Sequence, residues 1–293
     1  MDLSHFQSRY GDFTGQLPDI IAVKSGLKPV ARFRASGREG FQDFPEFKRI
    51  CEEEGLAASR TEEDGNYQTN VEVGYYIYIS RSGDLVEKAK KTDPSIGTGD
   101  PRKFGSVLGY PECCVERLRP ENVESVFLSE PVQTFDYRLN FFINFTNYYL
   151  VSHVPCSGAC RRSLEYSKSL FEKVKEFDSD YAARMRENLK LPVLVYFPDD
   201  TPANSLDRRE TVVFDGEFEG GSLHYTGFET DSSPDSGNDI KENLPALKKG
   251  DVLELGEGSI IIQKDEERLG SLPADSYTLF RFDDFTEEGG EDI

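Results

Sequence analysis

The sequence predicts an α+β fold with a mixed α/β N-terminal part, a helical middle that carries the cysteines, and a small antiparallel β C-terminal part. Three observations predict it. Strand-like and helix-like segments alternate in the first hundred residues, apolar residues repeat at near-helical spacing over Ser157–Leu189, and six short strand-like segments follow Pro192. We therefore expect a domain of residues 1–191, a β-rich domain of residues 192–285 and an acidic tail at residues 286–293.

Four elements are predicted in the first hundred residues. Lys28–Arg34 is a short strand, and Val73–Ser80, rich in aromatic and β-branched residues, is a second strand. Phe44–Gly55 is a helix that ends at a glycine, and Asp84–Lys91 is a helix that ends just before a proline. The apolar face of the first helix consists of Phe44, Phe47, Ile50 and Cys51. Cys51 is therefore predicted to fill space in the core.

The middle of the chain is predicted to be mostly helical. Pro111 suits the first position of a helix, where a missing N–H costs nothing. Phe135–Leu150 is predicted to be an aromatic-rich helix. Ser157–Leu189 is predicted to be the longest helix, with Ser157 as its N-cap and Pro192 just beyond its end.

The last third of the chain, unlike the helical middle, is predicted to form strands. Gly220-Gly221 is a strong hairpin signal between two of them. The six predicted strands are Pro192–Phe197, Thr211–Phe218, Ser222–Phe228, Val252–Leu255, Ser259–Gln263 and Tyr277–Phe282. A small antiparallel sheet or a partly closed barrel accommodates strands of this length.

The charge of the chain limits the classes of partner. The 293 residues carry a formal net charge of −20, which disfavours general electrostatic binding to nucleic acid or to an anionic membrane surface. The first residues, Met1–Phe13, lack the apolar segment of a secretory signal, and no stretch has the length of a membrane-spanning helix. We therefore expect a cytoplasmic protein without nucleic-acid or membrane partners, whose thiols stay reduced.

Four of the five cysteines fall into two short clusters, each preceded by a proline. The first is Gly109-Tyr110-Pro111-Glu112-Cys113-Cys114, and the second is His153-Val154-Pro155-Cys156-Ser157-Gly158-Ala159-Cys160. Each cluster is predicted to begin a helix, where the helix dipole favours the thiolate. Thiolates bind metal ions or attack electrophiles, so the clusters predict a site.

The spacing predicts which side chains share that site. Cys160 lies at the head of an apolar stripe and is expected to point inward, with Cys156 and His153 close to the same face. Cys113 and Cys114 diverge by about 100° on a helix, so we expect one to face the site and the other to pack in the core. These soft or borderline ligands suit Zn²⁺ or an iron–sulfur cluster.

Two structural alternatives stand beside this hypothesis. Buried cysteines often only fill space, and a pair of disulfides between the two helix starts is the main alternative to a ligand role. For His153, coordination and a hydrogen bond in the core are equally compatible with the pattern.

Three asparagines border the predicted site. Asn140, Asn144 and Asn147 form one polar stripe on the otherwise apolar predicted helix, and this helix leads directly into the second cysteine cluster. Buried amides need hydrogen-bond partners. The stripe therefore either faces solvent or lines a pocket that binds a small polar substrate or cofactor, and we favour the pocket.

The two cysteine clusters and the stretch that begins at Asn140-Phe141 resemble an uncharacterised prokaryotic family, the domain of unknown function 483. The resemblance extends roughly over Pro29–Phe197. It implies that the chain is one recurring unit whose cysteines act together, and it implies no particular reaction.

The sequence leaves three functions open. The first is a metal or iron–sulfur protein, with or without enzymatic activity, that uses the predicted Cys/His site. The second is a metal-free thiol redox or sulfur-transfer protein, in which one activated cysteine at a helix start is the nucleophile or sulfur carrier and a second cysteine resolves it. The third is a structural zinc centre that joins two helices in an interaction module.

Overall fold

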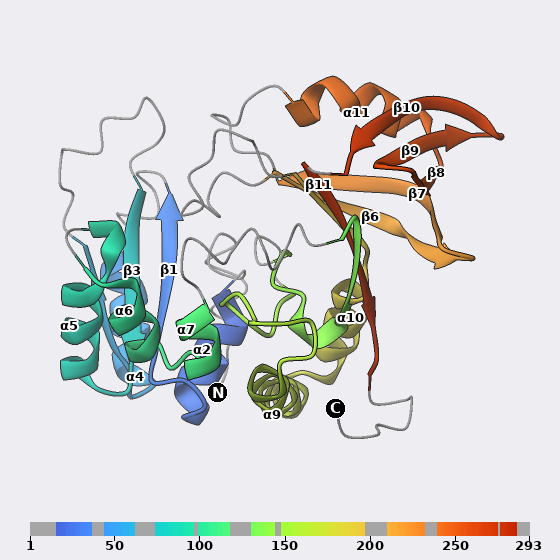
Figure 1. The fold of residues 1–293 in the computed structure, drawn as a ribbon. Helices are drawn as coiled ribbons and strands as arrows, with labels where there is room; N and C mark the ends of the chain where they lie inside the picture. The colour runs from blue at the N-terminus through green and yellow to red at the C-terminus, as the bar shows by residue number, and fades with distance from the viewer. Residues whose placement is uncertain are drawn as a thin grey trace.

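The computed structural model describes residues 16–36, 44–61, 74–96, 99–117, 130–143, 148–196, 210–231, 239–274 and 276–285. Two sheets dominate these residues, one of three strands and one of eight. Figure 1 shows the small sheet on the left and the large sheet on the right, with helices α2 (Leu17–Ser25), α7 (Glu112–Arg117) and α9 (Arg161–Phe177) between them.

The small sheet contains both strands predicted in the first hundred residues. Its antiparallel order is β1 (Val30–Ser36), β3 (Gly74–Ser80) and β2 (Ala57–Arg60). The predicted helices are confirmed as α4 (Phe44–Glu53) and α5 (Gly83–Thr92). Cys51 is fully buried on the apolar face of α4, as expected.

The predicted fold class is wrong in its C-terminal part. A large mixed sheet replaces the small antiparallel one, with the order β10-β9-β8-β7-β6-β5-β11-β4. β11 pairs antiparallel with β5 on one side and parallel with β4 on the other, and β4 precedes the second cysteine cluster in the chain. The strands are β4 (Val132–Asp136), β5 (Val193–Tyr196), β6 (Glu210–Glu219), β7 (Ser222–Asp231), β8 (Val252–Gly256), β9 (Ser259–Lys264), β10 (Glu267–Pro273) and β11 (Tyr277–Asp283).

The aromatic helix predicted over Phe135–Leu150 is also wrong. This stretch begins in β4 and continues through a 3-10 turn, η3 (Tyr137–Leu139). Asp136 starts the turn, because its carboxylate accepts hydrogen bonds from the backbone N–H and the guanidinium of Arg138. The phenylalanines that suggested a helix pack in the core instead, with the ring centroids of Phe142 and Phe280 4.3 Å apart.

The helix predicted over Ser157–Leu189 is two helices that meet at Asp178. α9 ends at Phe177, and α10 spans Ser179–Leu189. The carboxylate of Asp178 accepts hydrogen bonds from the backbone N–H groups of Asp180 and Tyr181, at 3.0 and 2.9 Å. A side chain that caps the second helix in this way breaks the continuous apolar stripe into two packed segments.

The large sheet is covered on both faces near its centre. The alternation of side chains along β5 places Val193 and Val195 in the core against α9 and α10, and Leu194 in a second core with Leu247 of helix α11 (Asp239–Lys249). Figure 1 shows α11 above the large sheet and α10 on its other side. The predicted acidic tail lies outside the described residues.

Candidate metal centre

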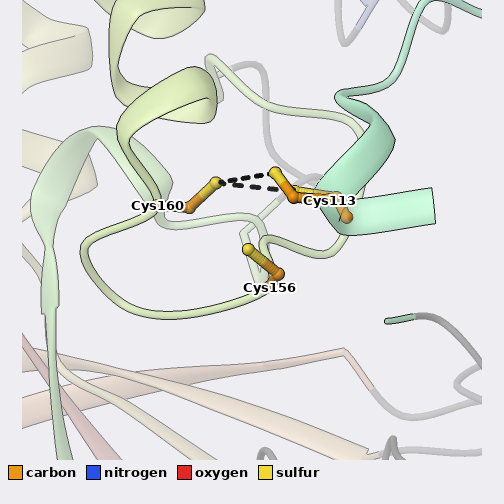
Figure 2. Close-up of side chains that lie close together, drawn as sticks. Cys113, Cys156 and Cys160 are labelled. Carbon is orange, nitrogen blue, oxygen red and sulfur yellow. Dashed lines mark hydrogen bonds between the residues drawn. The ribbon is translucent and has the colours of Figure 1, made fainter. Parts of the chain in front are cut away.

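The sulfur atoms of Cys113, Cys114, Cys156 and Cys160 all lie within 4.8 Å of one another. The Sγ–Sγ distances are 4.0 Å between Cys113 and Cys114, 3.8 Å between Cys113 and Cys160, and 3.6 Å between Cys114 and Cys160. Figure 2 shows the thiols of Cys113, Cys156 and Cys160 pointing toward one another, the first from the start of α7 and the other two from the loop that leads into α9. The predicted convergence of the two cysteine clusters is confirmed, and these four residues are here called the cysteine tetrad.

Both cysteines of the first cluster belong to the tetrad, so the expectation that one would turn away is wrong. Cys113 and Cys114 lie in the first turn of α7, whose side chains lean toward the helix N-terminus. At the end of a helix this tilt lets two consecutive side chains converge on a point beyond the helix, although their directions differ around the axis.

The second cluster forms a tight turn before α9, and the prediction that Ser157 caps a long helix is wrong. Cys160 occupies the N-cap position, its carbonyl accepts from the amide of Leu164 at 2.9 Å, and its own amide donates to the carbonyl of Ser157 at 3.2 Å. Cys156 and Cys160 therefore lie on the two sides of one turn.

Two glycines allow the backbone to approach closely enough to build the tetrad. A Cβ atom at Gly109 would lie 2.4 Å from Cδ of Pro29, and φ at Gly109 is +79°. A Cβ atom at Gly158 would lie 2.7 Å from both the Phe135 ring and the carbonyl oxygen of Thr134. At either position a larger residue would push the cysteine cluster away from the segment packed against it.

His153 lies behind the tetrad. Its Nε2 is 2.8 Å from Oγ of Ser163, and this Oγ is 3.4 Å from Sγ of Cys114. The four sulfurs therefore meet without the imidazole among them, and direct coordination by His153 stays a prediction. Burial, followed by the positive charge of Lys28, lowers the pKa of His153 to about 3, so the ring is neutral at pH 7.

The tetrad stabilises one thiolate among its neighbours. Hydrogen bonding from Cys114 lowers the pKa of Cys160 to about 3, whereas this same hydrogen bond and burial raise the pKa of Cys114. Burial and hydrogen bonding to Cys160 raise the pKa of Cys156 to about 12. Cys114 and Cys160 are buried, while Cys113 and Cys156 are partly exposed, so one side of the tetrad faces solvent.

A buried polar network lies beside His153, and no sequence pattern predicts it. Nζ of Lys28 lies 2.6 Å from Oδ1 of Asp19 and donates to Oγ of Ser152 at 2.6 Å. The ring of Tyr110 packs 5.0 Å from the ring of His153, and its hydroxyl donates to the Ser152 carbonyl at 3.1 Å. This network joins α2 and the residues just before β1 to the segment that carries the second cysteine cluster.

Of the three predicted asparagines, the structure describes only Asn140. Its side chain is fully buried, and Nδ2 donates to the Leu189 carbonyl at 3.0 Å. Asn144 and Asn147 lie outside the described residues, so a polar wall for a small substrate or cofactor stays a prediction. A pocket of about 1100 Å³ does lie over the large sheet, beside the end of α10, and it is lined by groups such as Lys190, Asp215 and His224 and by none of the tetrad cysteines.

Among the described residues, none of the helices combines the length and the apolar character needed to cross a membrane. The resemblance of the two cysteine clusters to the domain of unknown function 483 stays a prediction, since no family model, no curated protein and no solved structure matches this chain.

Proposed function

We propose that the chain binds one Zn²⁺ through Cys113, Cys114, Cys156 and Cys160, in a closed centre that stabilises the fold. The observation that carries this proposal is the spacing of the sulfurs: those of Cys113, Cys114 and Cys160 are 3.6, 3.8 and 4.0 Å apart, and that of Cys156 lies within 4.8 Å of the other three. Tetrahedral zinc with Zn–S bonds of about 2.3 Å has sulfur–sulfur edges of about 3.8 Å. One ion at the centre of the tetrad therefore reaches all four ligands with little rearrangement.

The same distances disfavour an iron–sulfur cluster. In such a cluster the cysteines bind different iron atoms, so their sulfurs surround a body of iron and sulfide rather than one point. Four sulfurs that all lie within 4.8 Å of one another leave room for a single ion between them.

The ligand set favours a structural role over a catalytic one. Four protein thiolates complete a tetrahedral shell, whereas catalytic zinc keeps one position for water or substrate. The ion would join α7 to the turn before α9, and Cys114 and Cys160 are 46 residues apart in the chain. Metal binding of this kind contributes directly to the free energy of folding.

A second candidate function is thiol redox chemistry in the metal-free protein. It is favoured by the low pKa of Cys160, which hydrogen bonding from Cys114 lowers to about 3. A thiolate beside partner thiols is a nucleophile with resolving groups at hand. The two functions predict different metal contents, so one experiment separates them.

The test is the metal content of protein purified without chelators and under reducing, anaerobic conditions. We expect one zinc per chain by mass spectrometry of the metal, and the absorption spectrum of tetrahedral thiolate-bound cobalt after exchange with Co²⁺. Cys156→Ser is expected to lose the metal, whereas the matched control Cys51→Ala, which removes the buried cysteine of α4, is expected to keep it. Folded, metal-free protein with a reversible disulfide contradicts the zinc centre and supports redox chemistry. Brown protein with absorbance at about 400 nm also contradicts it and supports an iron–sulfur cluster.

A further inference from the structure

We propose that Ser163 and His153 are positioning residues that hold the Cys114 ligand, with the serine hydroxyl donating to the sulfur and the histidine in the tautomer that carries its proton on Nε2. This inference depends on the proposed zinc centre and deepens it. It gives two residues that do not contact the ion the role of orienting one of its ligands.

The geometry places the serine hydroxyl between a sulfur and a ring nitrogen. Oγ of Ser163 lies 3.4 Å from Sγ of Cys114 and 2.8 Å from Nε2 of His153. Ser163 is 0% exposed and His153 is 6% exposed, so bulk water does not compete for these bonds.

The available protons decide the direction of the two hydrogen bonds. A metal-bound thiolate has no proton and can only accept, whereas a serine hydroxyl has one proton to donate. If that proton points to sulfur, the short contact on the other side of Oγ needs a donor, and Nε2–H of the neutral imidazole is that donor. The serine oxygen then accepts from His153 while its proton is held on the tetrad.

The surroundings of His153 fix the orientation of its ring. Tyr110, three residues before Cys113 in the chain, packs against the imidazole with ring centroids 5.0 Å apart. The Tyr110 hydroxyl is held by the carbonyl of Ser152, the residue before His153. The two cysteine clusters are therefore joined twice, once by the proposed metal ion and once by this contact.

Outer hydrogen bonds of this kind orient ligands, and their loss typically weakens metal affinity by about 10- to 100-fold. We expect Ser163→Ala and His153→Leu each to weaken zinc affinity within that range in a competition titration with a chromophoric chelator. His153→Gln, which can place an amide N–H near the position of Nε2, is expected to restore most of the affinity. The double variant is expected to lose little more than either single variant, because both remove the same chain of hydrogen bonds.

Ser167→Ala is the matched control. Ser167 is also fully buried on α9, but its hydroxyl donates to the Leu164 carbonyl at 3.0 Å rather than to the tetrad. We expect this variant to keep the zinc affinity of the unchanged protein. Equal losses in Ser163→Ala and Ser167→Ala contradict a specific role for Ser163.

The deciding measurement needs no variant. In zinc-loaded protein labelled with ¹⁵N-histidine, the ring nitrogens of His153 are expected to show the Nε2–H tautomer. An Nδ1–H tautomer overturns the inference and leaves the zinc centre intact, because the metal content is measured on the same sample. Protein that binds no zinc overturns the proposed function itself.

Discussion

Sγ of Cys114 lies 3.6 Å from Sγ of Cys160, although the two residues are 46 positions apart in the chain. Cys114 belongs to α7, beside the small sheet, and Cys160 begins α9, which packs toward the large sheet. Closing a loop of this length costs conformational entropy, and four thiols that approach one another need a partner that makes the closure favourable. The proposed zinc ion would offset this cost, because it would bind the folded arrangement and not the open chain.

The first prediction concerns the stability that zinc adds. A ligand that binds only the folded state stabilises it by about 4 kcal/mol when its free concentration is about 1000 times the dissociation constant. We expect the thermal unfolding temperature to rise with free zinc and to fall when a chelator is added. Cys156→Ser is expected to show no dependence on zinc, and Cys51→Ala is expected to keep it. Identical melting curves with zinc and with chelator, in the unchanged protein, contradict the prediction.

The second prediction concerns the buried ion pair behind the site. Nζ of Lys28 and Oδ1 of Asp19 are 2.6 Å apart, and their side chains are 4% and 3% exposed. Removing one partner leaves a buried charge uncompensated, which costs about 3–5 kcal/mol. We expect Lys28→Met to lower the free energy of unfolding by that amount in urea titrations, and Lys28→Met with Asp19→Asn to cost less than the sum of the two changes.

The exposed pair between Lys173 and Glu176, at 2.7 Å, is the control for that experiment. Surface ion pairs contribute about 0–1 kcal/mol, so Lys173→Met is expected to change stability little. A cost of Lys28→Met no larger than that of Lys173→Met contradicts the prediction.

The sequence predicts the fold wherever local periodicity decides it. The strand β3 and the helices α4 and α5 have clear patterns of apolar residues, and the structure contains them. β4 has no such pattern of its own, because it becomes a strand only by pairing with β11 from the far end of the chain. The helix α11 contains Pro245, and because proline is unfavourable inside a helix this segment has little local signal for one.

In the candidate site, the sequence predicts the cysteines but not the buried polar residues around them. The four cysteines are prominent in the sequence because they cluster, and their convergence is predicted from that clustering. Ser163 carries only a weak signal, its position three residues after Cys160 on one face of a helix. Asp19 and Lys28 carry no signal, because a buried charge and an exposed charge look alike in sequence until the fold brings the partners together.

The third prediction tests why the first cysteine cluster begins with a glycine. Gly109 has φ +79° and its Cβ would lie 2.4 Å from Pro29, whereas Gly55 has φ +73° and nothing within 4 Å of its Cβ. Alanine at either position lowers the free energy of unfolding by about 1–2 kcal/mol, because the backbone there is left-handed. We expect Gly109→Ala to cost more than Gly55→Ala in urea titrations, and to weaken zinc binding as α7 shifts. Equal costs with unchanged zinc affinity contradict the proposed close approach.

The fourth prediction concerns the pH dependence that Cys51 gives to folding. Burial, followed by the charge of Glu52, raises the pKa of Cys51 from 9.0 to about 12 in the folded protein. Between these values the unfolded state has released the proton and the folded state has kept it, so stability decreases as pH rises. The stabilising contribution is complete below the unfolded pKa and is lost progressively up to the folded one.

At a pH of about 10, one unit above the unfolded pKa, the loss is about 1.4 kcal/mol. Cys51→Ala removes this titration but leaves the tetrad and every tyrosine in place, so the measurement is the difference between the two proteins. We expect the unfolding free energy of the unchanged protein, relative to the variant, to fall by this amount between about pH 8 and about pH 10. A constant difference means that the Cys51 thiol ionises equally easily in both states, which full burial in an apolar core does not allow.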